Sequence, residues 1–331
     1  MELRHLRYFV AMAEAGSLMK ASERLYVAQP ALSVHLSNLE AELGTQLVTR
    51  SHRGIELTED GALLYERAVV MLKYHQESLN ALKSRKDKPK GLVSLGLPSS
   101  MSSMLLPKIY ECLREELPDV NMYIADASSS VLYEWLLDGK IDLAILFSLQ
   151  DTNALEQTPL YVEDYSLVSL PEGNGKADEI EFDKIFDYPL VTSSQATTWR
   201  KILDEAARSR GKILDVQVET ESFYAMRSLV LSGKCCALLP HSSMLQDIVE
   251  GRLQARKITN PDLRGLISVS HLKSRELQRS GRAVHDLVVR AARAVAGQTR
   301  AEARIPSAPQ FMRATPSTLF PLKPGNKASV V

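Results

Sequence analysis

The sequence predicts an α/β protein in three parts: a small helical unit with a β-wing, one long helix, and a larger body of strands and helices. Three observations support this fold class. Residues 1–60 contain three short amphipathic helical patterns followed by two short strands. A single helical pattern follows over residues 58–86, and strands alternate with helices over residues 92–296. A chain of 331 residues has room for two or three such domains.

The first two helices are short and are separated by a glycine. Apolar residues recur at helical spacing between Leu3 and Ala13. Gly16 ends this helix, and Ser17 stands at the N-cap position of the next one. The small residues Ala21 and Ser22 of the second helix would let another helix approach closely, and residues 26–28 make a tight connection to the third helix.

The third helix has two different faces. Four leucines face the expected core at i, i+4, i+7 and i+11, namely Leu32, Leu36, Leu39 and Leu43. Gln29, Ser33 and Ser37, spaced by four, form a separate polar stripe of short hydrogen-bonding groups. A recognition helix needs this division, because one face packs on the core and the other meets base edges. An ordinary surface helix would explain one such serine equally well, but the preceding helices and the tight turn favour DNA recognition.

A wing follows the third helix. Residues 47–57 predict two short strands that turn near Gly54. Arg50 and Arg53 lie close to that turn, where guanidinium groups can reach phosphates or enter the minor groove. Solvated surface arginines are the alternative, and the helices before the wing favour the DNA role.

These motifs together resemble the DNA-binding domain of LysR-type transcriptional regulators over residues 1–61. The match is continuous and is carried by residues 6–9, 16–18, 28–33, 39–44 and 57–61. The resemblance implies a major-groove role for Gln29, Pro30, Ser33 and Val34, and a wing role for Arg50 and Arg53. Three positions depart from the usual pattern: Ala28 replaces a frequent capping serine, Val48 a frequent Phe, and Val34 a longer polar side chain.

Bulk charge does not support DNA binding. The chain holds 40 Lys and Arg against 40 Asp and Glu, and residues 1–60 hold six basic against eight acidic side chains. The placement of charge is more favourable, because Glu40 and Glu42 lie at the far end of the third helix from Gln29. We therefore expect modest non-specific affinity for DNA.

The long helix is expected to join two copies of the chain. Thr58 caps it, and two adjacent apolar seams run along it to about Arg85. A helix of this length spans about 40 Å. Its wide apolar face would be exposed in an isolated helix, so the pattern predicts dimerisation, and the family resemblance implies the same, as a homodimer or homotetramer. Residues 83–91 form a charged hinge after it.

The body over residues 92–296 predicts a mostly parallel α/β sheet. The expected strands are 93–97, 120–124, 141–147, 165–170, 189–192, 216–220, 237–239 and 266–270, and the expected helices are 105–117, 131–137, 199–208, 225–231 and 279–295. The motifs at residues 117–120 and 136–144 resemble the effector-binding domain of the same family. That resemblance implies two α/β subdomains of periplasmic-binding-protein-like (type 2) fold, about 92–161 plus 267–296, and 162–266. With residues 28–33, these motifs are also similar to the nitrogen assimilation control (Nac) subgroup.

The resemblance places an effector between the two subdomains. Ligands of open α/β sheets bind beyond the carboxyl ends of strands, where hydroxyl groups and helix N-termini suit a small anion or polar metabolite. Helix capping and loop solvation are the alternatives for each hydroxyl, and the charge of the effector stays open. The candidate effector residues are Ser99, Ser100, Ser102, Ser128, Ser129, Ser148 and Thr197.

The composition of the chain also allows predictions about its C-terminal tail, its cysteines and its location in the cell. Residues 298–331 are punctuated by proline and predict a disordered tail. Three cysteines do not suggest a disulfide framework, and no signal peptide or membrane-spanning stretch is found, so we expect a cytoplasmic protein with no membrane partner. Cys235 and Cys236 lie in an apolar stretch and are expected to be buried, with a redox switch as the alternative.

The leading hypothesis is a transcriptional regulator that binds double-stranded promoter DNA and a small-molecule effector. RNA polymerase is a candidate partner, and neither a cofactor nor a metal is expected. The alternatives are an enzyme built on Cys235, Cys236, His241 and Asp142, and a solute-binding protein that uses only the α/β body. No metal spacing or nucleophile motif joins those four residues, and the N-terminal helices argue against both alternatives. Control by the abundance of the protein, without an effector, also stays open.

Overall fold

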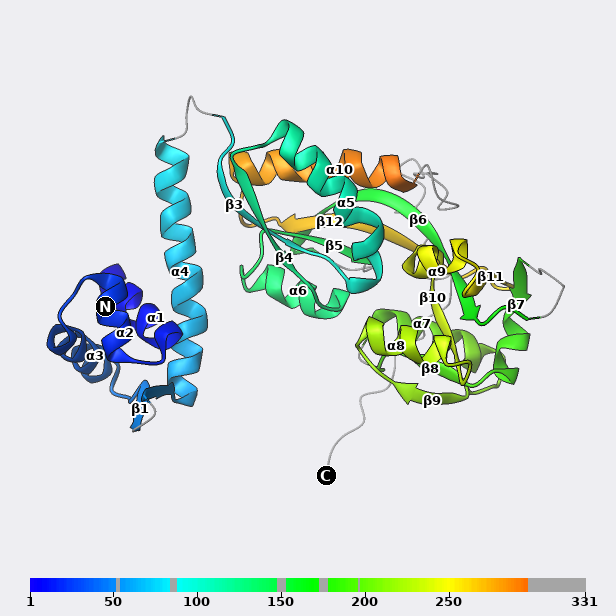
Figure 1. Cartoon of the computed structure of the whole chain (residues 1–331), viewed down its shortest axis with the longest axis horizontal. Coiled ribbons are helices and arrows are strands. Elements are labelled where there is room, and N and C mark those ends of the chain that lie inside the picture. Colours follow the sequence, from blue (N-terminus) through cyan, green and yellow to red (C-terminus); the bar gives the residue numbers. More distant parts are fainter. Residues whose placement is uncertain (52–53, 84–87, 148–152, 173–177, 196, 297–331) are drawn as a thin grey trace. The chain divides into compact units, whose positions relative to one another are not determined.

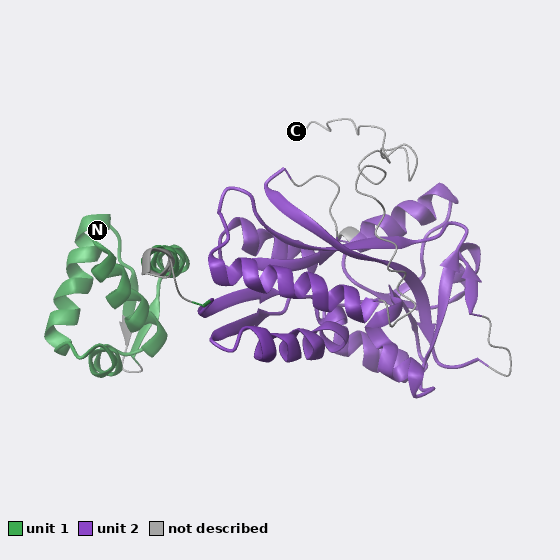
Figure 2. Cartoon of the chain, turned by 90° about the horizontal axis from the view of Figure 1, so that it is seen from above, with its two compact units in different colours: residues 1–88 green, residues 89–331 purple. Residues whose placement is uncertain are grey.

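The computed structural model contains two compact units, residues 1–88 and 89–331 (Figure 1, Figure 2). It describes the whole chain except residues 52–53, 84–87, 148–152, 173–177, 196 and 297–331. Arg53, Ser148 and the tail at 298–331 therefore lie outside the described residues, as do residues 84–87 of the charged hinge at 83–91.

The first unit consists of three short helices, a two-stranded wing and the long helix. These elements are α1 (Leu3–Ala15), α2 (Leu18–Leu25), α3 (Gln29–Leu43), β1 (Val48–Ser51), β2 (Gly54–Leu57) and α4 (Glu59–Lys83). Gly16 and Gly44 end α1 and α3 in the left-handed conformation, which glycine adopts without strain. Ser17 stands at the N-cap of α2 as predicted, although its side chain makes no capping hydrogen bond.

One apolar cluster holds this unit together. Phe9 of α1, Ala21 of α2 and Leu32 and Leu36 of α3 are fully buried in it. Ala21 lets the helices approach closely, because it has almost no side chain. Leu43 was expected to face this core as well, and that prediction was wrong, because Leu43 lies in the last turn of α3 and is 41% exposed.

The wing is attached to the turn between α1 and α2. The Ile55 amide donates to the Gly16 carbonyl at 2.9 Å. Gly54 has a φ of +128°, and a Cβ placed on it would lie 2.2 Å from the same carbonyl oxygen. The wing can reach this position only because residue 54 has no side chain.

The second unit is built on one ten-stranded sheet. Eight of its strands follow the order β4-β3-β5-β12-β6-β10-β8-β9, and the other two are β11, which pairs with β6, and β7, which pairs with β11. The strands are β3 (Gly91–Gly96), β4 (Val120–Ala125), β5 (Leu143–Phe147), β6 (Leu155–Ser169), β7 (Glu179–Glu181), β8 (Leu190–Thr192), β9 (Val216–Glu219), β10 (Cys236–Pro240), β11 (Gln254–Thr259) and β12 (Arg264–Leu272). The sheet is parallel in its outer parts, but β6 and β12 pair with their neighbours antiparallel. The prediction of a mostly parallel sheet was therefore wrong for its centre.

Helices cover both faces of this sheet, which divides into two lobes at β6 (Figure 1). In the first lobe, α5 and α10 pack on one face, and α6 packs on the other. In the second lobe, α7 and α8 cover opposite faces in the same way. The helices are α5 (Ser99–Glu116), α6 (Ser129–Leu137), α7 (Thr198–Ser209), α8 (Phe223–Leu231), α9 (Leu245–Val249) and α10 (Arg279–Ala296), with the 3-10 helices η1 (Phe182–Asp187) and η2 (His241–Met244).

Replacing Gly54 with alanine should destabilise the first unit, because the new methyl group would meet the Gly16 carbonyl in a backbone conformation that already disfavours a side chain. We expect Gly54→Ala to lower the free energy of unfolding by about 3 kcal/mol. Gly44→Ala is the matched control, since Gly44 also has a positive φ but has no atom within 4 Å of an added Cβ. Its cost should be about 1 kcal/mol. Equal losses in urea unfolding would show that the contact with Gly16 does not matter.

Candidate nucleic-acid interface and effector site

The side of α3 opposite the core is open to solvent. Gln29, Pro30, Val34 and Ser37 are exposed, and Ser33 is half-buried. Val34 is 58% exposed although it is apolar. An exposed helix face of short polar and small apolar side chains matches the dimensions and chemistry of the major groove.

This part of the unit carries no acidic residue. The chain has no Asp or Glu between Arg24 and Glu40, and the N-terminus of α3 adds its own partial positive charge. The acids beyond it are engaged elsewhere: the Glu40 carboxylate accepts from the amides of Leu47 at 2.8 Å and Val48 at 3.3 Å, and Glu42 pairs with the N-terminal ammonium group. Residues 1–60 are acidic overall, yet the exposed face of α3 carries no carboxylate between Arg24 and Glu40 that would repel a phosphate.

The same Glu40 side chain joins α3 to the wing, because Leu47 and Val48 lead into β1. Arg50 lies in β1 opposite Ile55 of β2, and its side chain is outside the described residues, as is the whole of Arg53. The Glu40 side chain therefore holds α3 and the start of the wing together.

The predicted effector residues of the first lobe lie near the ends of strands and mostly bond within the protein. Ser99 donates to Asp126 at 2.6 Å, and the Ser129 hydroxyl accepts from the Phe147 amide at 3.2 Å. Ser102 donates to the Pro98 carbonyl, and Ser128 bonds to Ser130. Ser100 is half-buried at the start of α5, and its hydroxyl group has no hydrogen-bond partner among the described residues. Of this group, Ser100 has the hydroxyl best able to meet a ligand.

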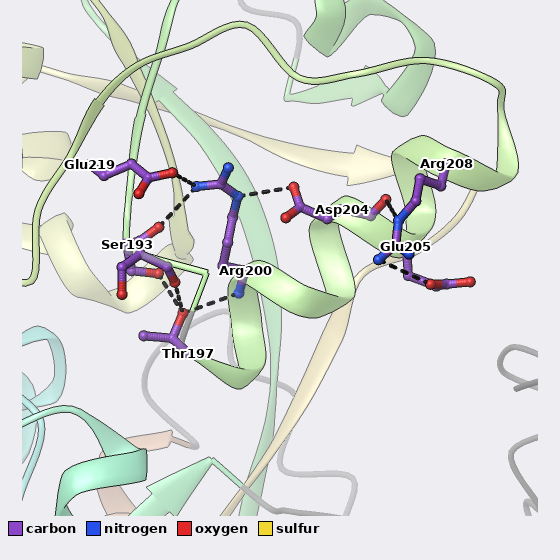
Figure 3. Close-up of polar contacts among 8 residues, drawn as sticks. Ser193, Thr197, Arg200, Asp204, Glu205, Arg208 and Glu219 are labelled. Carbon is purple, nitrogen blue, oxygen red and sulfur yellow. Dashed lines mark hydrogen bonds and ion pairs between the residues drawn. The ribbon is translucent and has the colours of Figure 1, made fainter. Parts of the chain in front are cut away.

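Thr197 belongs to a hydrogen-bonded loop that Arg200 organises (Figure 3). The Arg200 guanidinium is buried and donates to Asp204 at 2.9 Å, Glu219 at 2.7 Å and the Ser193 carbonyl at 3.1 Å. Thr197 accepts from the Arg200 amide at 3.3 Å and so caps α7. A guanidinium with several charge-assisted partners holds such a loop in one conformation. The sequence analysis did not single out Arg200, because its partners lie up to 19 residues away.

An aromatic contact joins the two lobes close to Ser129. Phe147 ends β5 in the first lobe and meets Tyr165 of β6 and Trp199 of α7, with ring centroids 5.7 and 6.3 Å away. Tyr165 and Trp199 stack on each other, and the Trp199 indole donates to the Leu238 carbonyl at 3.2 Å. These large side chains bring residues of both lobes together, so a movement between the lobes must change their packing.

Comparison with known proteins identifies the two units. Residues 3–62 match the bacterial regulatory helix-turn-helix proteins of the lysR family, and residues 86–293 match the LysR substrate binding domain. The chain belongs to the LysR family of transcriptional regulators. This LysR-type regulator is a DNA-binding protein with an effector-binding domain, and the predicted family and fold class are confirmed.

Two relatives of this LysR-type regulator are nitrogen assimilation regulatory proteins, Nac, which confirms the predicted subgroup. The Escherichia coli protein is 30% identical over 292 residues, which cover 87% of this chain and 94% of the relative. The Klebsiella aerogenes protein is 31% identical over 244 residues, covering 73% and 79%. Full-length CbnR, solved in complex with its target DNA, has the same fold with a TM-score of 0.67, 23% identity, and coverage of 88% of this chain and 100% of CbnR.

The alternative of an enzyme is wrong for this LysR-type regulator, whose relatives are regulators of transcription. Cys235 and Cys236 are buried, as expected, and burial raises the pKa of the Cys236 thiol to about 11, so the reactive thiolate is scarce. Asp142 has a structural role instead, since it accepts from the backbone and the hydroxyl of Ser94. His241 lies in the second lobe, 3.4 Å from the Ser166 hydroxyl.

Metal-binding clusters and membrane-spanning helices can be assessed only in the part of the chain that the structure describes. No group of three or more His, Cys, Asp or Glu side chains there is placed to hold a metal ion. No helix in that part is long and apolar enough to cross a membrane.

Proposed function

We propose that this regulator reads double-stranded operator DNA through the exposed side of α3. Gln29, Pro30, Ser33, Val34 and Ser37 meet base edges, and Arg50 and Arg53 at the wing contact phosphates or the minor groove. The absence of acidic residues between Arg24 and Glu40 is the observation that carries this proposal, because DNA would repel an acidic helix face. The hydrogen bonds from Leu47 and Val48 to Glu40 support a wing held at a constant position beside α3.

Dimerisation through α4 is the second part of the proposal. Ala68 is fully buried against the first unit, but five large apolar side chains of the same helix are exposed in the single chain. They are Leu63, Val69, Met71, Tyr74 and Leu79. A soluble helix rarely exposes so many apolar groups unless a second chain covers them. A dimer would also present two copies of α3 to two half-sites.

The region between the two lobes is the proposed effector site. Ser100, Ser128 and Ser129 of the first lobe and Thr197 of the second lie near strand ends and helix N-termini, which suit a small polar metabolite or anion. Ser99, Ser102 and Ser148 complete the proposed set. We also propose that the protein is cytoplasmic. Sequencing the DNA fragments that the protein binds in the cell would identify the genes that it controls.

Gln29→Ala should weaken binding to the operator by about 1–3 kcal/mol and leave binding to random DNA nearly unchanged, because a glutamine amide can form two hydrogen bonds to an adenine edge. Gln46→Ala is the matched control, since Gln46 is exposed beyond the opposite end of α3. Fluorescence anisotropy on both duplexes measures the difference. A loss of the same size on random DNA would exclude base reading by Gln29.

Leu79→Asp should produce a monomer that binds the operator poorly, because it places a charge on a face that a second chain would bury. Leu92→Asp makes the same change at a leucine of β3 that is 65% exposed, and it should leave the oligomer intact. Sedimentation velocity distinguishes the two. A Leu79→Asp protein that sediments like the wild type would contradict dimerisation through α4.

Ser100→Leu should abolish the response to the effector and preserve operator binding, because the larger side chain would fill the space beside α5. Ser103→Leu adds the same volume at an exposed position on that helix and should switch normally. A reporter strain grown with and without the inducing condition gives the readout. Normal switching by the Ser100→Leu protein would show that the effector binds elsewhere or that protein abundance alone controls transcription.

A further inference from the structure

The exposed side of α3 carries an apolar stripe beside its polar one. Pro30 and Val34 are four residues apart and both are exposed, so their side chains lie next to each other on one side of the helix. Val34 is 58% exposed. The polar stripe of Gln29, Ser33 and Ser37 runs alongside, one residue round the helix. The face proposed to read DNA therefore offers two kinds of group, hydrogen-bonding side chains and apolar ones.

This helix holds no lysine or arginine. The chain has neither residue between Arg24 and Arg50, so the whole of α3 is without them. Its histidine, His35, packs toward α1, with its ring centroid 5.1 Å from that of Tyr8 and 5.5 Å from that of His5. The bidentate contact of Arg or Lys with guanine is the commonest specific contact in the major groove. That contact is not open to α3, which must distinguish bases by uncharged groups.

Val34 gains little from the protein itself. The core side of α3 is formed by Leu32, Leu36 and Leu39, and Val34 is not among the residues packed in that cluster. Valine is also a weaker helix former than glutamine, arginine, lysine or glutamate, so a polar residue would serve an exposed helix position at least as well. A single exposed valine is common on protein surfaces. The place of Val34 on the face proposed to enter the major groove is what gives this valine a partner outside the chain.

We propose that Val34 packs against the 5-methyl group of a thymine in the operator, an inference that rests on the proposed reading of DNA by α3. Of the four bases, thymine alone presents a methyl group in the major groove. A valine held against a base donor or acceptor would displace water from that group without replacing its hydrogen bond. Contact with thymine has no such cost and removes apolar surface of both partners from water. Val34 therefore favours thymine and disfavours the other three bases.

Removing the thymine methyl group from the DNA tests this contact without any change in the protein. Deoxyuridine pairs with adenine as thymidine does and lacks only that methyl group. The full-length wild type is titrated with operator duplexes in which the thymines are replaced one at a time, and binding is followed by fluorescence anisotropy. At one thymine in each half-site we expect the affinity to fall about fourfold, the loss that corresponds to one methyl group excluded from water. Equal affinity for every substituted duplex would overturn the proposal.

Val34→Ala assigns the contact to Val34. Because it removes both methyl groups, this variant should bind the operator at least about fourfold more weakly and should bind the thymine and uracil duplexes equally at the position found above. Alanine is the best helix former, so the variant is expected to fold. Val249→Ala removes the same atoms from a valine of the second unit that is 77% exposed, and it should behave like the wild type. A Val34→Ala protein that still distinguishes thymine from uracil at that position would overturn the assignment.

A failure of this inference can be separated from a failure of the proposed function. Gln29→Ala removes a hydrogen-bonding side chain of the neighbouring stripe, so it should weaken operator binding and still distinguish thymine from uracil at the position assigned to Val34. If Gln29→Ala loses operator affinity but no thymine substitution affects the wild type, α3 reads DNA and the Val34 contact is wrong. If neither change has an effect, the proposed reading of DNA by α3 is wrong and the Val34 contact is wrong with it.

Discussion

β6 provides backbone hydrogen bonds to both lobes of the second unit. Its residues 155–164 pair with β12, and residues 165–169 pair with β10 and β11. Buried backbone groups must keep hydrogen-bond partners, so the lobes cannot separate without breaking this strand's pairing. Movement between them is confined to bending or twisting at β6, and the side chains on β6 are the first to respond. Tyr165 lies on it.

The first unit could be predicted almost completely, because its signals are local. Helix ends at Gly16 and Gly44, the turn at residues 26–28 and the cap at Thr58 each depend on a few neighbouring residues. The leucine spacing of α3 gave the correct core except for Leu43, which is the last residue of the helix and is exposed. Side chains of the wing arginines lie outside the described residues, so the wing was confirmed only as a pair of strands.

The first half of β6 was missed for a physical reason. Residues 155–164 include Pro159 and four charged or amide side chains, a composition that argues against a central strand. The structure accommodates Pro159 at a register shift: Ile267 of β12 faces Tyr161 and the next residue, Ser268, faces Pro159. A bulge of this kind tolerates a residue without an N–H group. Because β6 is the strand that joins the lobes, missing it also hid the antiparallel centre of the sheet.

The positions of the site residues near strand ends and helix starts could be predicted from the sequence, but their hydrogen-bond partners could not. Thr197 caps α7 through a contact three residues away, and such capping can be read from sequence. The bond from Ser99 to Asp126 and the bond from the Phe147 amide to Ser129 join segments 18 or more residues apart, and only the fold brings them together.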